Sequence, residues 1–119
     1  MNPEAEYIKL LKTKGVSLNS PGLSEIALSR ADAIIAVELL RSASIPILGG
    51  DVYFKKNKGI ESAYANWHTD PMDGEDRGSF VTRSCRDTLN YIENFPPTEA
   101  MPIFVLVIDS GGQRGQSQK

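Results

Sequence analysis

The sequence has 119 residues, of which 40% are hydrophobic and 24% charged, a composition typical of one globular domain. A formal net charge of −2 argues against a nucleic-acid-binding protein, because such proteins need a broad cationic surface. The only cysteine, Cys85, excludes an internal disulfide framework. The sequence lacks the positively charged start and following apolar segment of a signal peptide, so we expect none. Its longest apolar run is too short to span a bilayer. We therefore expect a cytoplasmic protein.

The chain begins with two predicted helices separated by a short strand. Asn2 is suited to cap the first helix, and Gly15 is suited to stop it. Residues 19–22 are turn material, and residues 25–28 predict a short strand. Ser29 then resembles a helix cap, and the apolar spacing that follows predicts a helix over residues 30–42.

The next strand contains Gly49 and Gly50, and glycines inside a strand often mark a bulge. Without a bulge, Ile45, Ile47, Asp51 and Tyr53 share one face. A one-residue bulge instead places Ile45, Ile47, Val52 and Phe54 on one face and Leu48, Asp51 and Tyr53 on the other. We prefer the bulge because it separates apolar from polar residues better. The turn Asn57-Lys58-Gly59 predicts a hairpin between residues 45–56 and 60–68.

The second half of the chain predicts an acidic loop, a helix and a strand. Ser79 is the expected cap of the helix, and Pro96 follows its end. The uninterrupted apolar residues 103–108 predict a strand in the centre of the sheet. Residues 1–110 are expected to form one domain, and residues 111–119 a disordered tail. The predicted core contains Val37, Leu40, Cys85, Leu89, Ile92, Val105 and Val107.

These elements predict a two-layer α+β fold, with an N-terminal helix followed by β-α-β-β-α-β. This order is ferredoxin-like, or belongs to a related antiparallel sheet with its helices on one face. In the ferredoxin-like order the last strand lies at an edge, which conflicts with its apolar sequence. Either the N-terminal helix covers this strand, or the strand order differs.

The candidate catalytic and metal-binding residues do not form a convincing site. His68, Asp70, Asp73 and Asp76 do not have EF-hand spacing, and zinc would need more His or Cys ligands. A Cys85 nucleophile with His68 as its base is less favoured than core packing, because Cys85 lies on an apolar helix stripe. We therefore predict no enzyme, no metal and no cofactor.

Four segments in order resemble the immunity protein 40 family: residues 28–33, the GGDVY-containing residues 45–53, the YANW at 64–67, and the strand at 103–108. The resemblance extends from about Gly22 to Ile108. Members of this family are small bacterial proteins that neutralise a toxin delivered between competing cells, in contact-dependent inhibition and polymorphic-toxin systems.

The resemblance implies an immunity protein that binds the C-terminal domain of a cognate toxin and inhibits it stoichiometrically. From composition and charge we expect a cytoplasmic protein that binds neither nucleic acid nor membrane, and we expect a monomer or weak dimer when it is free. The alternative is a ferredoxin-like regulatory or small-ligand-binding module, in which the glycine-bearing strand lines a pocket.

The predicted toxin-binding surface combines the hairpin with the acidic loop after it, so that carboxylates and aromatic anchors share one side. Large aromatic residues such as Trp67 and Tyr53 are more often core residues than interface anchors. For Asp51, a structural hydrogen bond and a contact with a cation of a partner are about equally favoured. The acidic loop is also compatible with a solvated face, and the basic turn at residues 55–58 with an acidic partner. The predicted residues are Asp51, Tyr53, Trp67, His68, Asp70, Asp73, Glu75 and Asp76.

Overall fold

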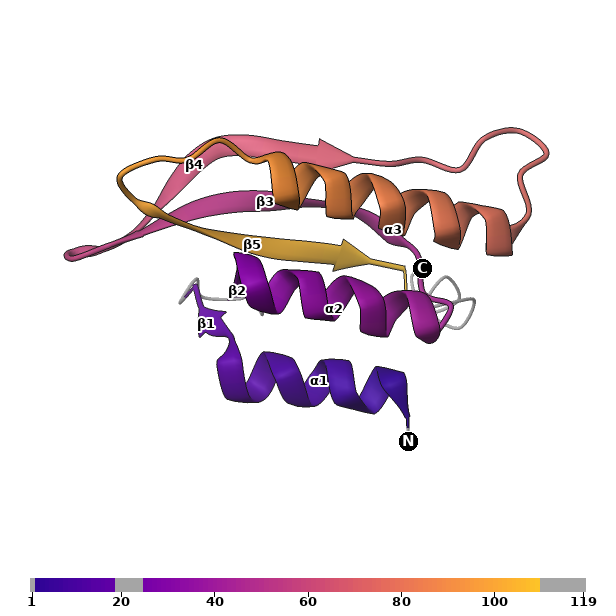
Figure 1. The fold of residues 1–119 in the computed structure, drawn as a ribbon, viewed down its shortest axis with the longest axis horizontal. Coiled ribbons are helices and arrows are strands. Elements are labelled where there is room, and N and C mark those ends of the chain that lie inside the picture. Colours follow the sequence, from indigo (N-terminus) through magenta and orange to yellow (C-terminus); the bar gives the residue numbers. More distant parts are fainter. Residues whose placement is uncertain (1, 19–24, 110–119) are drawn as a thin grey trace, which may run out of the picture.

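The computed structural model describes residues 2–18 and 25–109, which form three helices and a five-stranded sheet (Figure 1). The predicted turn at residues 19–22 and the predicted tail at 111–119 lie outside the described residues. The elements in chain order are α1 Pro3–Lys14, β1 Val16–Ser17, β2 Ile26–Ser29, α2 Arg30–Ser42, β3 Ile47–Lys56, β4 Gly59–His68, α3 Arg77–Asn94 and β5 Met101–Ile108.

The strands pair antiparallel in the order β1-β2-β5-β3-β4. The last strand, β5, therefore lies between β2 and β3 rather than at the edge that a ferredoxin-like order gives it. This order explains the apolar sequence of β5, because the strand contributes to an apolar cluster on each face of the sheet: Phe104 to the core beneath the helices, and Ile103 and Val105 to a smaller cluster on the other face. Ile103, Phe104 and Val105 are all buried. The α+β fold class is confirmed, and the conflict over β5 is resolved by a different strand order.

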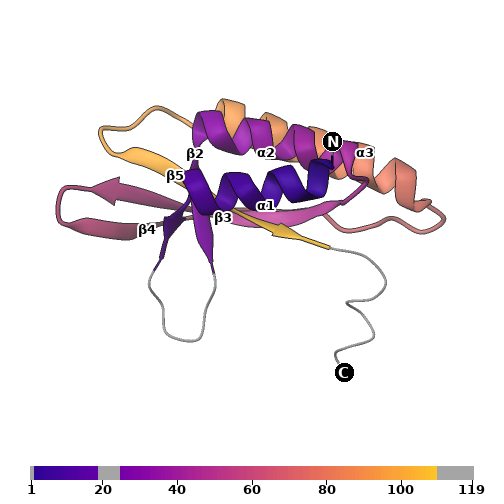
Figure 2. The same cartoon turned by 90° about the horizontal axis from the view of Figure 1, so that it is seen from below.

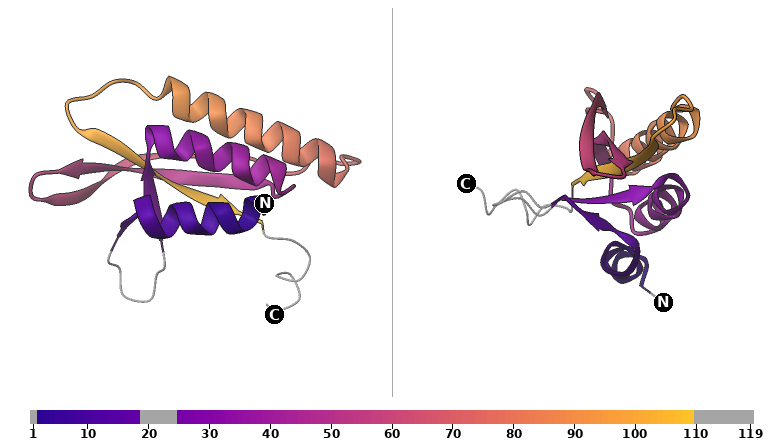
Figure 3. Two further views of the ribbon diagram at one scale, coloured as in Figure 1. Left: turned by 60° about the horizontal axis from the view of Figure 1, so that its bottom comes forward. Right: turned by 90° about the vertical axis from the view of Figure 1, so that its left-hand side faces the viewer.

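All three helices lie on one face of the sheet (Figures 2 and 3). The middle helix, α2, packs against both α1 and α3. Its residues Ala33, Ala36, Val37 and Leu40 are buried, as the apolar spacing of the helix predicts. The opposite face of the sheet has no helix packed on it among the described residues (Figure 3).

Capping residues set the helix starts. Asn2 and Ser29 accept hydrogen bonds from the backbone N–H groups of Ala5 and Asp32, so both predicted caps are confirmed. The prediction of Ser79 as the cap of α3 is wrong. The carboxylate of Asp76 accepts the N–H of Ser79 at 2.8 Å, and α3 begins at Arg77. An aspartate three residues earlier caps the helix instead, so the helix is three residues longer at its start than predicted.

Two predicted core residues are more exposed than expected. Val107 is 42% exposed, because its neighbour on β3 is Gly49, which has no side chain to cover it. Leu89 is only partly buried, because it lines a groove between α3 and α2 instead of facing the sheet. The other five predicted core residues, Val37, Leu40, Cys85, Ile92 and Val105, are buried.

The hairpin and its bulge are confirmed. The register of β3 against β5 shifts between Ile47 and Gly49, which adds one residue to β3 at Leu48. Val52 then joins the core under the helices, whereas Tyr53 packs on the opposite face. Side chains satisfy the backbone at the bulge: the hydroxyl of Ser84 accepts the N–H of Ile47, and the hydroxyl of Thr69 donates to its carbonyl.

Candidate functional site

The face of the sheet without helices carries four cross-strand rows, because paired residues on antiparallel strands point to the same side. Val105 and Tyr53 lie in a small apolar cluster of their own, separate from the core beneath the helices. We call the surface formed by these rows the open face. Read across β5, β3 and β4, the rows are Val107–Gly49–His68, Val105–Asp51–Asn66, Ile103–Tyr53–Ser62 and Met101–Lys55–Ile60.

The first two rows form the acidic end of the open face. Asp51 lies opposite Asn66, and the Nε2 atom of His68 lies 3.6 Å from a carboxylate oxygen of the exposed Asp70. A shallow, open hollow of about 250 Å³ is lined by Asp51, Asn66 and His68 among others. Enclosed small-molecule sites are usually larger, about 300–1,000 Å³.

The third row is centred on Tyr53, which is partly buried against β5. Burial raises the pKa of its phenol, and the negative charges of Glu25 and Asp51 raise it further. The negative charges of two carboxylates are therefore felt at the phenol of Tyr53. The hydroxyl remains a neutral hydrogen-bond donor and acceptor at physiological pH.

Tyr64 lies between Ala63 and Ala65, which both pack against the core beneath the helices, and the sequence analysis did not select it. Exposure alternates along β4, with Ala63, Ala65 and Trp67 partly buried and the residues between them exposed. Tyr64 is 94% exposed and has a φ of 55°. This left-handed conformation costs a residue other than glycine roughly 1–2 kcal/mol. The strand pattern contains no signal for it, because the conformation arises from an irregular register opposite Val52 and Tyr53.

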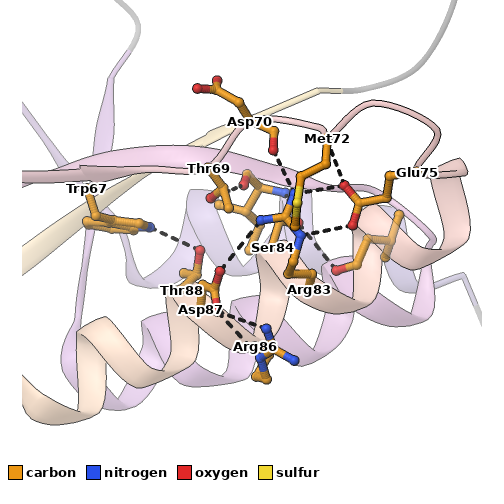
Figure 4. A network of polar contacts seen from close by, with 12 residues as sticks. Trp67, Thr69, Asp70, Met72, Glu75, Arg83, Ser84, Arg86, Asp87 and Thr88 are labelled. Atoms are coloured by element: carbon orange, nitrogen blue, oxygen red, sulfur yellow. Dashed lines mark hydrogen bonds and ion pairs between the residues drawn. The ribbon is translucent and has the colours of Figure 1, made fainter.

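Trp67 points to the other side of the sheet, under the helices. Its indole stacks on Tyr91 with ring centroids 4.6 Å apart, and its N–H donates to the hydroxyl of Thr88 at 3.0 Å (Figure 4). Of the two interpretations of Trp67, the structure shows core packing. Trp67 is also among the residues that border the hollow.

The two glycines of the GGDVY segment explain why this tryptophan fits. A β-carbon on Gly50 would lie 2.3 Å from the Trp67 ring and 2.2 Å from the carbonyl oxygen of Val105. A β-carbon on Gly49 would lie 2.2 Å from the carbonyl oxygen of Trp67, and the φ of Gly49 is 148°. The Gly-Gly pair and the tryptophan therefore form one packing unit within the sheet.

The acidic loop is mostly tied to α3. The carboxylate of Glu75 pairs with the guanidinium of Arg83 at 2.8 Å and accepts the N–H of Met72 (Figure 4). These hydrogen bonds lower the pKa of Glu75 to about 2. Asp76 caps the helix, and Asp73 is exposed. The backbone carbonyl of Asp70 also accepts from Arg83, and its carboxylate points away from the helix (Figure 4).

The arrangement of Cys85 and His68 does not suit nucleophilic catalysis. Cys85 is buried between the helices and the sheet, and burial raises the pKa of its thiol to about 11. His68 lies on the open face, on the other side of the sheet. Within the described residues, no group of three or more His, Cys, Asp and Glu side chains is placed to hold a metal ion.

The structure thus brings together four of the eight predicted site residues, Asp51, Tyr53, His68 and Asp70, on or beside the open face. Asp73 lies in the loop beyond them. The other three have partners elsewhere: Trp67 in the helix layer, Glu75 with Arg83, and Asp76 at the start of α3.

The fold defines a small α+β domain whose helices lie on one face of the sheet, and residues of β3 and β4 are accessible on the other face. The model of the immunity protein 40 family matches residues 17–108, which is most of the chain. The chain belongs to the immunity protein 40 family, as its sequence segments indicate. No curated protein and no solved structure matches it. In the part of the chain described here, every helix is too short or too polar to cross a bilayer.

Proposed function

We propose that this protein binds the C-terminal domain of a cognate toxin with its open face and inhibits it stoichiometrically, without catalysis. Membership of the immunity protein 40 family supports a role in immunity. The choice of the open face as the binding surface rests on the contrast between the two sides of the sheet. The helix side is a packed core, whereas the open side presents Asp51, Tyr53 and His68 to solvent or partly so.

The charge of the open face favours a basic partner. Asp51 and Asp70 lie at one end, and the lysine of the four rows, Lys55, lies at the other. Carboxylates at a rim increase the rate of encounter with a cationic protein, and partly buried aromatic residues slow its dissociation. We therefore propose that Asp51, Tyr53, His68 and Asp70 contact the toxin, with Asp73 at the margin.

The remaining predicted residues support the surface indirectly. Trp67 holds β4 against α3, and Glu75 holds the loop through Arg83. Asp76 caps α3. Replacing these residues would weaken binding by loosening the fold, so they are poor probes of the interface.

The first test is co-expression with the C-terminal domain encoded by the neighbouring toxin gene, followed by gel filtration. A stable one-to-one complex is expected. If no complex forms and free amino acids or nucleotides instead raise the melting temperature, the small-ligand-binding alternative is favoured.

The second test locates the surface. Replacing both Asp51 and Asp70 by Asn should slow association about tenfold at low salt and reduce its salt dependence. Glu93→Gln, on the exposed side of α3, is the matched control and should leave association unchanged. Surface plasmon resonance at two salt concentrations measures both. If the double variant binds like wild type and charge reversal at Lys55 and Lys56 abolishes binding, the proposed surface is wrong.

A further inference from the structure

Tyr64 has two properties that do not help the free protein to fold. Its backbone adopts the left-handed conformation, with φ 55°, and its side chain is 94% exposed. The hydroxyl of Ser62 accepts the N–H of Tyr64 at 3.0 Å, so the local geometry is held by a hydrogen bond. A strained residue whose ring contributes little burial to the core indicates a role outside the core.

The backbone at this point disfavours docking by strand addition. β4 is an edge strand of the sheet. Its register against β3 is irregular, because Ala65 pairs with Val52 but Ser62 pairs with Tyr53. Ala63 and Tyr64 are the extra residues, and such a bulge interrupts the row of hydrogen-bonding groups that an added strand requires. The bulge therefore presents a side chain rather than an edge.

The surroundings of Tyr64 indicate which side chain it would bind. Asn66 lies two residues further along β4 and pairs with Asp51. Asp70 lies beyond it, at the same end of the open face. An exposed aromatic ring near carboxylates is a favourable place for a cationic side chain, since the ring attracts the cation and the carboxylate pairs with it.

We propose that Tyr64 anchors an arginine or lysine side chain of the toxin domain, which stacks on the tyrosine ring and pairs with the carboxylate of Asp51. This inference rests on the proposed function. It assigns a contact of the interface to a residue whose backbone the free protein already holds in place through the hydroxyl of Ser62.

The experiment compares stability and affinity in the same variants, with the C-terminal domain of the neighbouring toxin gene as the probe. Tyr64→Gly and Tyr64→Asn both tolerate the left-handed conformation. Their urea midpoints should equal or exceed that of wild type, while their affinities fall at least tenfold. Ile35→Ala, which removes a half-exposed residue of α2 from the opposite layer, should leave affinity unchanged.

Two further variants test the chemistry of the contact. Tyr64→Phe keeps the ring and should bind within about threefold of wild type, whereas Tyr64→Leu keeps an apolar side chain and should lose at least tenfold. If one cation contacts both residues, Asp51→Asn combined with Tyr64→Leu should lose less affinity than the sum of the single losses.

The proposal is overturned if Tyr64→Gly and Tyr64→Asn bind like wild type, or if their urea midpoints fall together with affinity, which would assign Tyr64 to stability. Equal binding by Tyr64→Leu and Tyr64→Phe, or strict additivity with Asp51→Asn, would overturn the cation contact. Failure of the proposed function is a separate result, because in that case wild type itself forms no complex.

Discussion

The two faces of the central sheet are built from the same strands but carry different parts of the sequence. Beneath the helices, Trp67 lies over Gly50 and Phe104 is fully buried. On the open face, alternate residues of the same strands leave Asp51 and Tyr53 partly accessible. The GGDVY and YANW segments therefore contain both packing residues and candidate contact residues. A family motif is a guide to the place in the fold, and only side-chain direction separates the two roles.

The largest effect that separates the faces is expected from a cavity on the helix side. Ile92→Ala should lower the free energy of unfolding by about 2–5 kcal/mol, because Ile92 is fully buried. Leu89→Ala should cost less, since Leu89 is only partly buried. Val107→Ala on the open face should change stability by about 0.5 kcal/mol. Urea denaturation measures all three, and a Val107 effect as large as that of Ile92 would contradict the assignment of the faces.

A smaller loss of stability is expected at Gly50, where the packing on the helix side leaves no room for a side chain. Gly50→Ala should cost about 1–3 kcal/mol, because the added β-carbon would lie 2.2 Å from the Val105 carbonyl oxygen and 2.3 Å from the Trp67 ring. Displacement of the indole should also shift the tryptophan fluorescence to longer wavelength. Gly78→Ala is the matched control, because its nearest atom is 3.5 Å away and alanine favours the helix. An unchanged urea midpoint for Gly50→Ala would refute the packing unit.

The smallest effect on stability is expected in the acidic loop that connects β4 to α3. The pKa of Glu75 is lowered from 4.5 to about 2, mainly by its hydrogen bonds with Arg83. The folded state therefore gains stability from the ionised carboxylate above pH 4.5, and this gain is lost as the pH falls through about 2. The difference in urea midpoint between wild type and Glu75→Gln should be largest near neutral pH and shrink in acid. The same difference for the exposed Asp73→Asn should stay small, and a pH-independent Glu75 effect would exclude the linkage.

Local signals in the sequence predicted most of the elements. Capping side chains at Asn2 and Ser29 and the turn at residues 57–59 act through neighbours in the chain, so they can be read without the fold. The bulge near Gly49 was also predictable, because only a shifted phase sorts the apolar residues of β3. The start of α3 was missed because Asp76 and Ser79 are both good capping residues.

The candidate site was predictable only in part. The hairpin and its carboxylates were found because Asp51 and Tyr53 have the strand phase of the side opposite the core. Trp67 was open between core and surface, since an aromatic residue suits both, and contacts with Tyr91 and Thr88 from a distant helix decide it. Tyr64 was missed because its exposure and its φ depend on how β4 pairs with β3.

By itself, the sequence determined the α+β class, the succession of elements and the membership of the immunity protein 40 family, because these depend on periodicity and on local order in the chain. Only the tertiary structure decided that β5 lies between β2 and β3, that Trp67 turns inward, and that Tyr64 is exposed in a left-handed conformation. The physical reason is that strand order and side-chain burial depend on contacts between residues far apart in the chain, which a one-dimensional pattern does not contain.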